Sequence, residues 1–297
     1  MSRFTIRSST AATALLIFVT FIWGFTFVTN QYVLKYMSVA DLMAWRFGIA
    51  ALLMLVARPK SIVQLNREQL GHGITLGIFL SIGYLAQMVG LKGTTATASG
   101  FITGMFVVIT PLISGFVFKQ AISRYAWFAV GLATVGLGLI ALKGTHVSTG
   151  DAITLLCAFM FACHIVGLSR WSQTNIVYGL TTLQLCVVAI FSITLSLIKG
   201  GPALPPNGTT WLCIVLLAVL ASCLGFFAQT WVQSKVSSTR AAIILTMEPV
   251  FAGIAGVTIG TDDLTKRLVA GALCILTAMY LVELSPRKSD GVLHIEM

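Results

Sequence analysis

The chain has 297 residues, of which 57% are apolar and only 9% charged, and its mean hydropathy is +0.93. These values lie far outside the range of soluble globular domains and predict an integral membrane protein. The formal charge is +10, but the cations fall one to three at a time between apolar segments. That pattern is typical of membrane topology and contact with anionic lipid headgroups, so no nucleic-acid partner is expected.

Ten apolar segments are long enough to cross a bilayer as helices. The first is too long for a secretory signal and lacks an A-x-A-like cleavage site, so we expect it to remain as a spanning helix. The connections are short, and no soluble domain is expected between them. In chain order the segments cover 11–30, 39–57, 71–91, 97–118, 124–142, 152–169, 178–198, 210–233, 240–260 and 268–284.

Lysine and arginine are unevenly divided between the two sides of this arrangement. With the amino terminus inside, twelve fall on the inner side and six on the outer side. Positive residues are retained on the cytoplasmic side, so the bias predicts a multi-pass protein of the bacterial inner membrane with both termini in the cytoplasm.

A weak internal repeat relates the two halves of the chain. A shift of 138 places Trp23 opposite Phe161 and Pro111 opposite Pro249, and a shift of 141 aligns the small-residue runs of the fourth and ninth segments better. Units of five helices must enter the membrane in opposite directions. Secondary transporters have this inverted architecture, with the site near the midplane between the halves.

The predicted fold is therefore an all-α membrane protein with ten transmembrane helices arranged as two inverted five-helix repeats, residues 1–144 and 145–297. The two units are expected to form one integral bundle. Such a bundle satisfies its backbone hydrogen bonds within each helix, as the bilayer interior requires.

The ninth segment places Glu248 and Pro249 near its middle, where each is costly. Glu248 shares a helical face with small residues and is expected to point into the bundle. Its carboxyl group either takes part in transport or bonds to a neighbouring helix and fixes the packing there. Pro249 is a candidate hinge, and so is Pro111 in the first half.

Two further titratable residues lie within predicted helices. His164 reaches a depth similar to that of Glu248, and either shares a proton with it or bonds to a backbone carbonyl. Arg46 either extends towards the outer surface or holds a carboxylate that enters from that side. Its counterpart in the repeat, Gln184, is polar and uncharged.

Several aromatic residues and one amide lie away from the predicted helix ends. They are either walls of a cavity that accepts an apolar side chain or parts of the packed core, and the amide either lines the cavity or joins two helices. These candidates are Trp23, Tyr84, Phe101, Phe161, Phe227 and Gln87.

Motifs for enzymatic chemistry are missing from the sequence. There is no G-x-x-x-x-G-K-[ST] loop for ATP and no G-x-S-x-G or H-E-x-x-H motif. All six cysteines lie in apolar segments without a Cys-x-x-Cys pair, so they are expected to be small buried residues. We expect no enzymatic activity, no cofactor and no metal.

An ordered set of short motifs resembles the EamA-type branch of the drug/metabolite transporter superfamily. The set comprises Trp23-Gly24, Arg46-Phe47, Gly90-Leu91-Lys92 followed by Ser99-Gly100-Phe101, and Thr239-Arg-Ala-Ala with Glu248-Pro249. The resemblance covers nearly the whole chain. It implies ten helices in two inverted repeats, cytoplasmic termini, a central cavity and export of amino acids or other small metabolites.

One departure from the family pattern concerns the ends of the fourth and ninth helices. The family usually places a Glu after each, whereas this chain has Lys119-Gln120 and Thr261-Asp262-Asp263. Since these positions lie outside the expected cavity, the departure affects surface or gating contacts.

We therefore expect a secondary transporter that exports small metabolites by alternating access, with amino acids as the leading substrate class. Its expected partners are a small-molecule substrate and the lipid bilayer. The alternatives are an exporter of lipophilic cations or drugs, with Glu248 as counter-charge, and a membrane scaffold or sensor that transports nothing. The lack of an appended signalling domain argues against the last.

Overall fold

The computed structural model describes residues 2–94, 96–119, 124–141, 149–259 and 263–284, in which helices joined by short connections are present and strands are absent. The helices are α1 (Ser2–Val33), α2 (Val39–Ala57), α3 (Arg67–Leu91), α4 (Ala96–Gly104), α5 (Phe106–Phe118), α6 (Arg124–Ala141), α7 (Thr149–Trp171), α8 (Val177–Ile198), α9 (Gly208–Leu216), η1 (Leu217–Leu224), α10 (Gly225–Gln233), α11 (Ser238–Leu245), α12 (Met247–Ile259) and α13 (Lys266–Leu284).

Eight helical stretches in the described residues are long and apolar enough to cross a membrane. They correspond to eight of the ten predicted segments. The predicted fifth and tenth segments form α6 and α13, whose apolar stretches, Trp127–Gly136 and Val269–Ala278, are shorter than a full span. The protein is thus a multi-pass, all-helical membrane protein.

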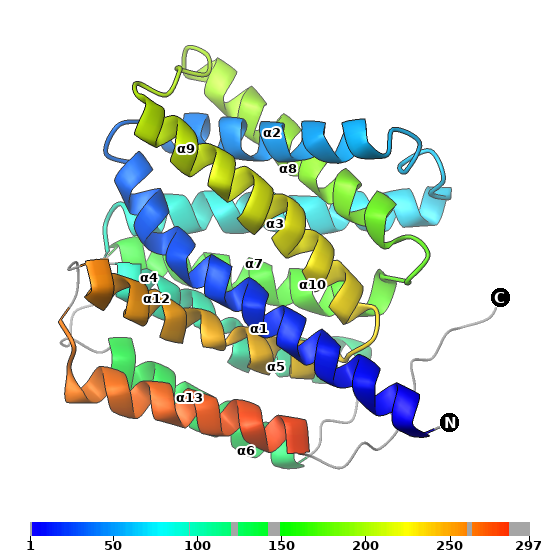
Figure 1. Cartoon of the computed structure of the whole chain (residues 1–297), viewed down its shortest axis with the longest axis vertical. Coiled ribbons are helices and arrows are strands. Elements are labelled where there is room, and N and C mark those ends of the chain that lie inside the picture. Colours follow the sequence, from blue (N-terminus) through cyan, green and yellow to red (C-terminus); the bar gives the residue numbers. More distant parts are fainter. Residues whose placement is uncertain (1, 95, 120–123, 142–148, 260–262, 285–297) are drawn as a thin grey trace.

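The helices lie side by side in one bundle (Figure 1). α6 and α13 pack together along one edge, and α2 packs on α8 at the opposite edge. Between these edges α3 contacts α7, and α1 contacts both α12 and α10. The start of α1 and the end of α13 lie at the same end of the bundle.

Two of the eight spans are interrupted in the middle. Met105 separates α4 from α5, and Thr246 separates α11 from α12, 141 positions further along the chain. At each break the backbone amide donates to the carbonyl three residues earlier, Met105 to Ile102 at 3.1 Å and Thr246 to Ile243 at 3.2 Å; the Thr246 amide is shared with the Ala242 carbonyl, also at 3.2 Å. This tightening of the last helical turn is common at helix ends.

Pro249 and Pro111 lie at different distances from these breaks. Pro249 is the third residue of α12, within the first turn, where its missing amide removes little bonding. Pro111 lies inside α5, six residues after Met105. The positions at which the family pattern expects Glu, Gln120 and residues 261–262, lie outside the described residues.

A third span contains a π-helix. The eight residues of η1 join α9 to α10 without a loop. A π-helical turn inserts an extra residue and takes backbone carbonyls out of α-helical register, and such turns are frequent at functional sites.

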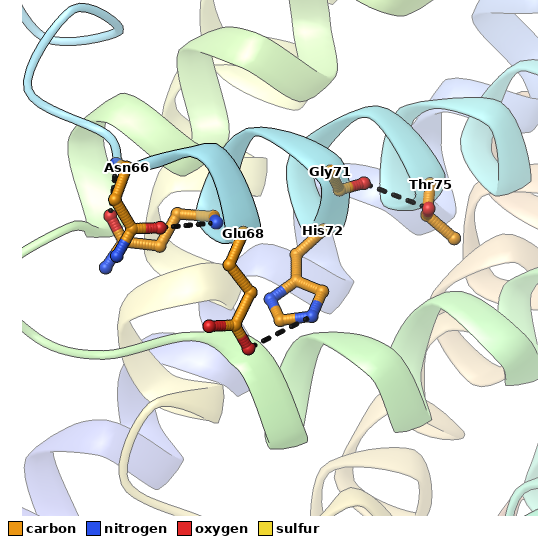
Figure 2. A network of polar contacts seen from close by, with 6 residues as sticks. Asn66, Glu68, Gly71, His72 and Thr75 are labelled. Carbon is orange, nitrogen blue, oxygen red and sulfur yellow. Dashed lines mark hydrogen bonds and ion pairs between the residues drawn. The ribbon is translucent and has the colours of Figure 1, made fainter. Parts of the chain in front are cut away.

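The start of α3 is fixed by local polar contacts (Figure 2). Asn66 and Gln69 form a reciprocal capping box, with the Gln69 amide donating to Asn66 Oδ1 at 2.8 Å. One turn later His72 Nε2 lies 3.9 Å from Glu68 Oε1. The His72 ring stacks on Trp171 at 4.4 Å between centroids, which ties the start of α3 to the end of α7.

Glycine permits the closest helix crossing near the centre. A β-carbon added to Gly24 of α1 would meet Phe251 Cβ at 2.5 Å and the Ala252 amide nitrogen at 2.8 Å. The backbone of α1 therefore lies almost directly on α12, as small residues allow in membrane bundles. This crossing brings α1 beside Glu248.

Candidate functional site

A central cavity lies between helices from both halves of the chain. Its free volume is about 30 Å³, room for roughly two water molecules, so a metabolite would need the helices to move apart. The lining residues are Trp23 and Thr26 of α1, Leu80, Tyr84 and Gln87 of α3, Phe106 of α5, Phe161, His164 and Ile165 of α7, Phe226 and Gln229 of α10, Leu245 of α11 and Glu248 of α12.

The cavity lies at the level of both helix breaks. Phe106 directly follows Met105, and Leu245 and Glu248 flank Thr246. The hydrogen-bond ladder is irregular at both breaks, and helices bend where their ladder is irregular, so these are places at which the two spans can change angle. Motion at either break would change the shape of the cavity.

Glu248 is the one acidic residue in the cavity lining, and it is 7% exposed. Among the described residues its carboxyl group has no hydrogen bond and no ion pair within 4 Å. The nearest relevant charge is that of Arg46, which is within Coulomb range. Because a buried carboxyl group needs a partner or a proton, an unpartnered one facing a cavity is available to a ligand.

Arg46 lies behind the cavity wall. It is 2% exposed, and its Nε donates to Ser222 Oγ of η1 at 2.9 Å. The guanidinium carbon lies 5.0 Å from the ring centroids of Phe47 and Tyr84, a distance typical of cation–π contacts. Its Nη2 is buried without a hydrogen bond. The side chain therefore stays inside the bundle, contrary to the alternative in which it extends to the surface.

His164 pairs with a residue of the neighbouring helix. Its Nε2 lies 2.7 Å from Gln184 Oε1 of α8, and the Gln184 amide donates to the Leu180 carbonyl at 3.0 Å. The neutral ring therefore carries its proton on Nε2, because Gln184 Oε1 can only accept. No bond joins His164 to Glu248 among the described residues, so the proton-sharing alternative is not realised in this conformation. The partner of the ring is a side-chain amide, where the other alternative placed a backbone carbonyl.

Aromatic side chains contribute five of the thirteen residues that line the cavity. Trp23 Nε1 donates to the Ala221 carbonyl of η1 at 2.9 Å, and the ring lies 5.4 Å from that of Phe226. Tyr84 contacts Phe161 edge-on at 5.2 Å. The π-helix η1 leaves the Ala221 carbonyl free to accept a hydrogen bond from the Trp23 indole of α1, and so it provides a contact between helices.

Two amides add polar groups to this wall. Gln87 Nε2 donates to Thr103 Oγ1 at 3.3 Å, which joins α3 to α4. Gln229 is 2% exposed, and its Oε1 is buried without a hydrogen bond. Together with Glu248, Gln229 gives the cavity two acceptors that no described residue satisfies.

Most of the aromatic and polar residues singled out in the sequence meet in this cavity, but three do not line it. Arg46 lies behind Tyr84. Phe101 is 8% exposed and packs in the hydrophobic core. Phe227 is 37% exposed and faces an outer groove. The residues brought together are Trp23, Tyr84, Gln87, Phe161, His164 and Glu248.

Phe226 takes the place expected for Phe227. Neighbouring residues on a helix point about 100° apart, so only one of the two can face the cavity. Ser222, Gln229 and Gln233 share the face of Phe226 at helical spacing. That row of polar residues was the available signal, since polar groups in a span turn away from lipid. No comparable row of polar residues marked the helical face of Phe106 as one that lines the cavity.

The described residues contain no group of three His, Cys, Asp or Glu that could hold a metal ion. All six cysteines are free thiols. The side chains that line the cavity offer a ligand one acid, two amides, an imidazole and several aromatic rings.

Comparison with known proteins decides the family. The model of the EamA-like transporter family matches the chain twice, at residues 10–142 and 148–284. The chain belongs to the EamA-like transporter family. The two matches cover most of the sequence, and with them the resemblance to the EamA branch of the drug/metabolite transporter superfamily is confirmed.

Individual relatives of this EamA-like protein agree on transport and differ in how much is known of them. An uncharacterized transporter of Archaeoglobus fulgidus is 33% identical over 90% of this chain and 83% of its own. A biotin transporter of Escherichia coli is 24% identical over 93% of this chain and 95% of its own. A solved crystal structure superimposes with a TM-score of 0.74 at 17% identity, covering 93% of this chain and 97% of that one, and shows the same fold.

Proposed function

We propose that this EamA-like protein is a secondary transporter that exports small metabolites, with amino acids as the leading class, by alternating access. It would do so as two inverted five-helix repeats, residues 1–144 and 145–297, with α6 and α13 as the fifth and tenth helices. The double family match supports this arrangement, and so do helix breaks 141 positions apart. We assign it no enzymatic activity.

The helix contacts also follow the expected symmetry. α2 and α8 hold equivalent places in the two repeats and pack on each other, as do α6 and α13. The contact of α3 with α7 has its counterpart in that of α1 with α10. An exchange of the two halves would reproduce these contacts, which is the condition for alternating access by inverted repeats.

The observation that carries the proposal is Glu248, unpartnered among the described residues and facing an aromatic cavity between the halves. An ammonium group would find there a carboxylate, the free Gln229 Oε1 and ring faces, all of which attract a cation. The apolar side chain of an amino acid would pack on the rings, and its carboxylate would lie towards Arg46. The biotin transporters among the relatives add a second kind of amphipathic carboxylate to the candidates.

We place the protein in the bacterial inner membrane with both termini in the cytoplasm. The division of twelve inner and six outer cations supports this orientation. Export then means movement from the side on which α1 begins to the opposite side.

An exporter of lipophilic cations is the second candidate, because one acid among aromatic rings also suits a cation without a carboxylate. The two candidates differ in their use of Arg46. The positive charge of Arg46 would attract the carboxylate of an amino acid, whereas it would repel a lipophilic cation.

The test is transport of a panel of radiolabelled amino acids, biotin and a lipophilic cation in proteoliposomes, with and without a pH gradient. We expect Glu248→Gln to lower transport of the accepted substrate at least tenfold. Glu68→Gln is the matched control, because the same change falls on a side chain that is 80% exposed. Absence of transport across the whole panel, or an active Glu248→Gln variant, would overturn the proposal.

A further inference from the structure

A second hollow opens on the outside of the bundle, between α1 and the η1–α10 helix. Its volume is about 400 Å³, far larger than that of the central cavity. Leu15, Phe18 and Ile22 line it from α1, and Leu224, Phe227 and Trp231 from the other side. Figure 1 shows these two helices running alongside each other at the front of the molecule.

The groove opens on the outer, apolar surface of the helix bundle, which lipid would contact. Phe18 is 58% exposed and Leu224 is 52% exposed, although both belong to apolar spans. Every lining side chain is apolar apart from the indole nitrogen of Trp231, so the groove has almost nothing to offer a polar ligand. Its occupant must be hydrocarbon, which the bilayer supplies.

A cation stands at the end of the groove. Lys235 follows the last residue of α10 by two positions and is exposed. Its Nζ lies 3.7 Å from the centroid of the Trp231 ring, and that ring lines the groove. Lysine and tryptophan at the end of a span mark the depth of the lipid headgroups. A chain lying in the groove would therefore end where an anionic headgroup meets a positive charge.

From this combination we propose that the groove binds an acyl chain of an anionic phospholipid whose headgroup lies at Lys235. The occupant is a bilayer lipid because the groove has an apolar lining and a cation at one end. These two properties fit an amphiphile that has an apolar chain and one charged end. A free anion could bind Lys235 but would leave the apolar groove empty. An uncharged lipid could fill the groove but would give Lys235 no negative group to bind.

The bound chain would lie against the outer side of the cavity wall. Ile22 and Gly225 line the groove, and the neighbouring Trp23 lines the central cavity. A β-carbon on Gly225 would meet Trp23 Nε1 at 2.7 Å, so the indole fills all the space between the two hollows at this point. The lipid thus supports the position of Trp23 from the membrane side.

The experiment uses the full-length protein in nanodiscs that contain phosphatidylglycerol with a photoreactive diazirine in its acyl chain. After illumination, labelled residues are located by mass spectrometry. We expect labelling of the groove residues to exceed several-fold that of other exposed apolar positions such as Ile190 and Ile198. Equal labelling over all exposed faces would overturn the proposal.

Two variants separate the chain from the headgroup. Ala228→Phe fills the groove and should abolish its labelling, whereas Ala270→Phe places the same side chain on an exposed face of α13 and should leave it unchanged. Lys235→Gln should lower labelling by phosphatidylglycerol several-fold and leave that by a phosphatidylcholine probe unaltered. Because Lys235 is exposed, this change tests the site even if Ala228→Phe does not fold.

The other possible occupants would give distinct results that overturn the assignment. Loss of groove labelling when a lipophilic cation is added would make the groove a route for substrate. Groove residues that stay unlabelled in nanodiscs whose mass corresponds to two copies of the protein would make it an interface with a second copy. None of these readouts depends on transport, so the inference can fail or hold independently of the proposed function.

Discussion

The two interrupted spans have similar backbones and different chemistry. α4–α5 breaks at Met105 and α11–α12 breaks at Thr246, in each case beside the central cavity. In the register of these breaks Glu248 corresponds to Val107 of the first half, which is fully buried and apolar. The interrupted helix thus occurs in both halves, whereas the buried acid occurs in the second half alone.

Other paired positions show the same contrast. Arg46 of α2 corresponds to Gln184 of α8, which bonds to His164. Gly24 of α1 corresponds to Ala162 of α7. In each pair the two helices hold equivalent places in their repeats, but the residue types at the paired positions differ. The two halves therefore share the positions of their helices and differ in the side chains that those helices carry at the centre of the bundle.

The largest effect on stability should come from Gly24, where α1 lies almost directly on α12, and it should exceed the effect at Ala162, the corresponding position of α7. Gly24→Ala should lower the free energy of unfolding by about 3 kcal/mol, the upper end of the cost of overpacking, because backbone atoms of α12 stand in the way. Ala162→Gly should cost only about 1 kcal/mol. Thermal unfolding in detergent measures both, and equal losses would contradict the asymmetry.

The next effect concerns the histidine pair. His164→Thr gives α7 the residue that α1 carries at the corresponding position 26. It leaves Gln184 Oε1 buried without a partner, which should cost about 2 kcal/mol. His164→Gln keeps a donor and serves as the control. If both variants unfold at the temperature of the native protein, the pair contributes nothing to the fold.

A smaller effect, on binding, should distinguish the two substrate classes. Arg46→Gln gives the first half the side chain of the second and removes a positive charge near Glu248. A lipophilic cation should then bind about fivefold more tightly, roughly 1 kcal/mol, while transport of an amino acid falls.

Tryptophan fluorescence titration measures the affinity change that Arg46→Gln produces. Arg58→Gln is the matched control, because Arg58 is exposed and its guanidinium carbon lies 5.0 Å from the Tyr178 ring centroid. A lipophilic cation that binds Arg46→Gln no more tightly than the native protein would remove Arg46 from any electrostatic role in the cavity.

The smallest effect should come from a contact between the two broken spans. Ser114 of α5 and Ser238 of α11 share a hydrogen bond of 2.9 Å. Ser114→Ala or Ser238→Ala alone should cost about 1 kcal/mol, and the double variant less than the sum. Strict additivity in this double-mutant cycle would show that the contact does not couple the spans.

The sequence alone determined the class of this protein, its family and eight of the ten predicted spans. Composition excludes a soluble domain because only a bilayer accommodates so many apolar segments of about 20 residues. Glu248 could be identified as unusual because an acid in such a segment is costly enough to need a reason. Each of these inferences depends on local sequence and on the properties of the membrane.

Only the tertiary structure decided which side chains meet. It placed Phe226 in the cavity and Phe227 in the outer groove, set Arg46 behind Tyr84, and joined His164 to Gln184 in place of Glu248. Helical periodicity tells which residues share a face, but the rotation of each helix about its axis depends on how all the helices pack. The helix breaks, the π-helix and the lipid-facing groove follow from that packing, because backbone register and hollows between helices are properties of neighbouring chain segments.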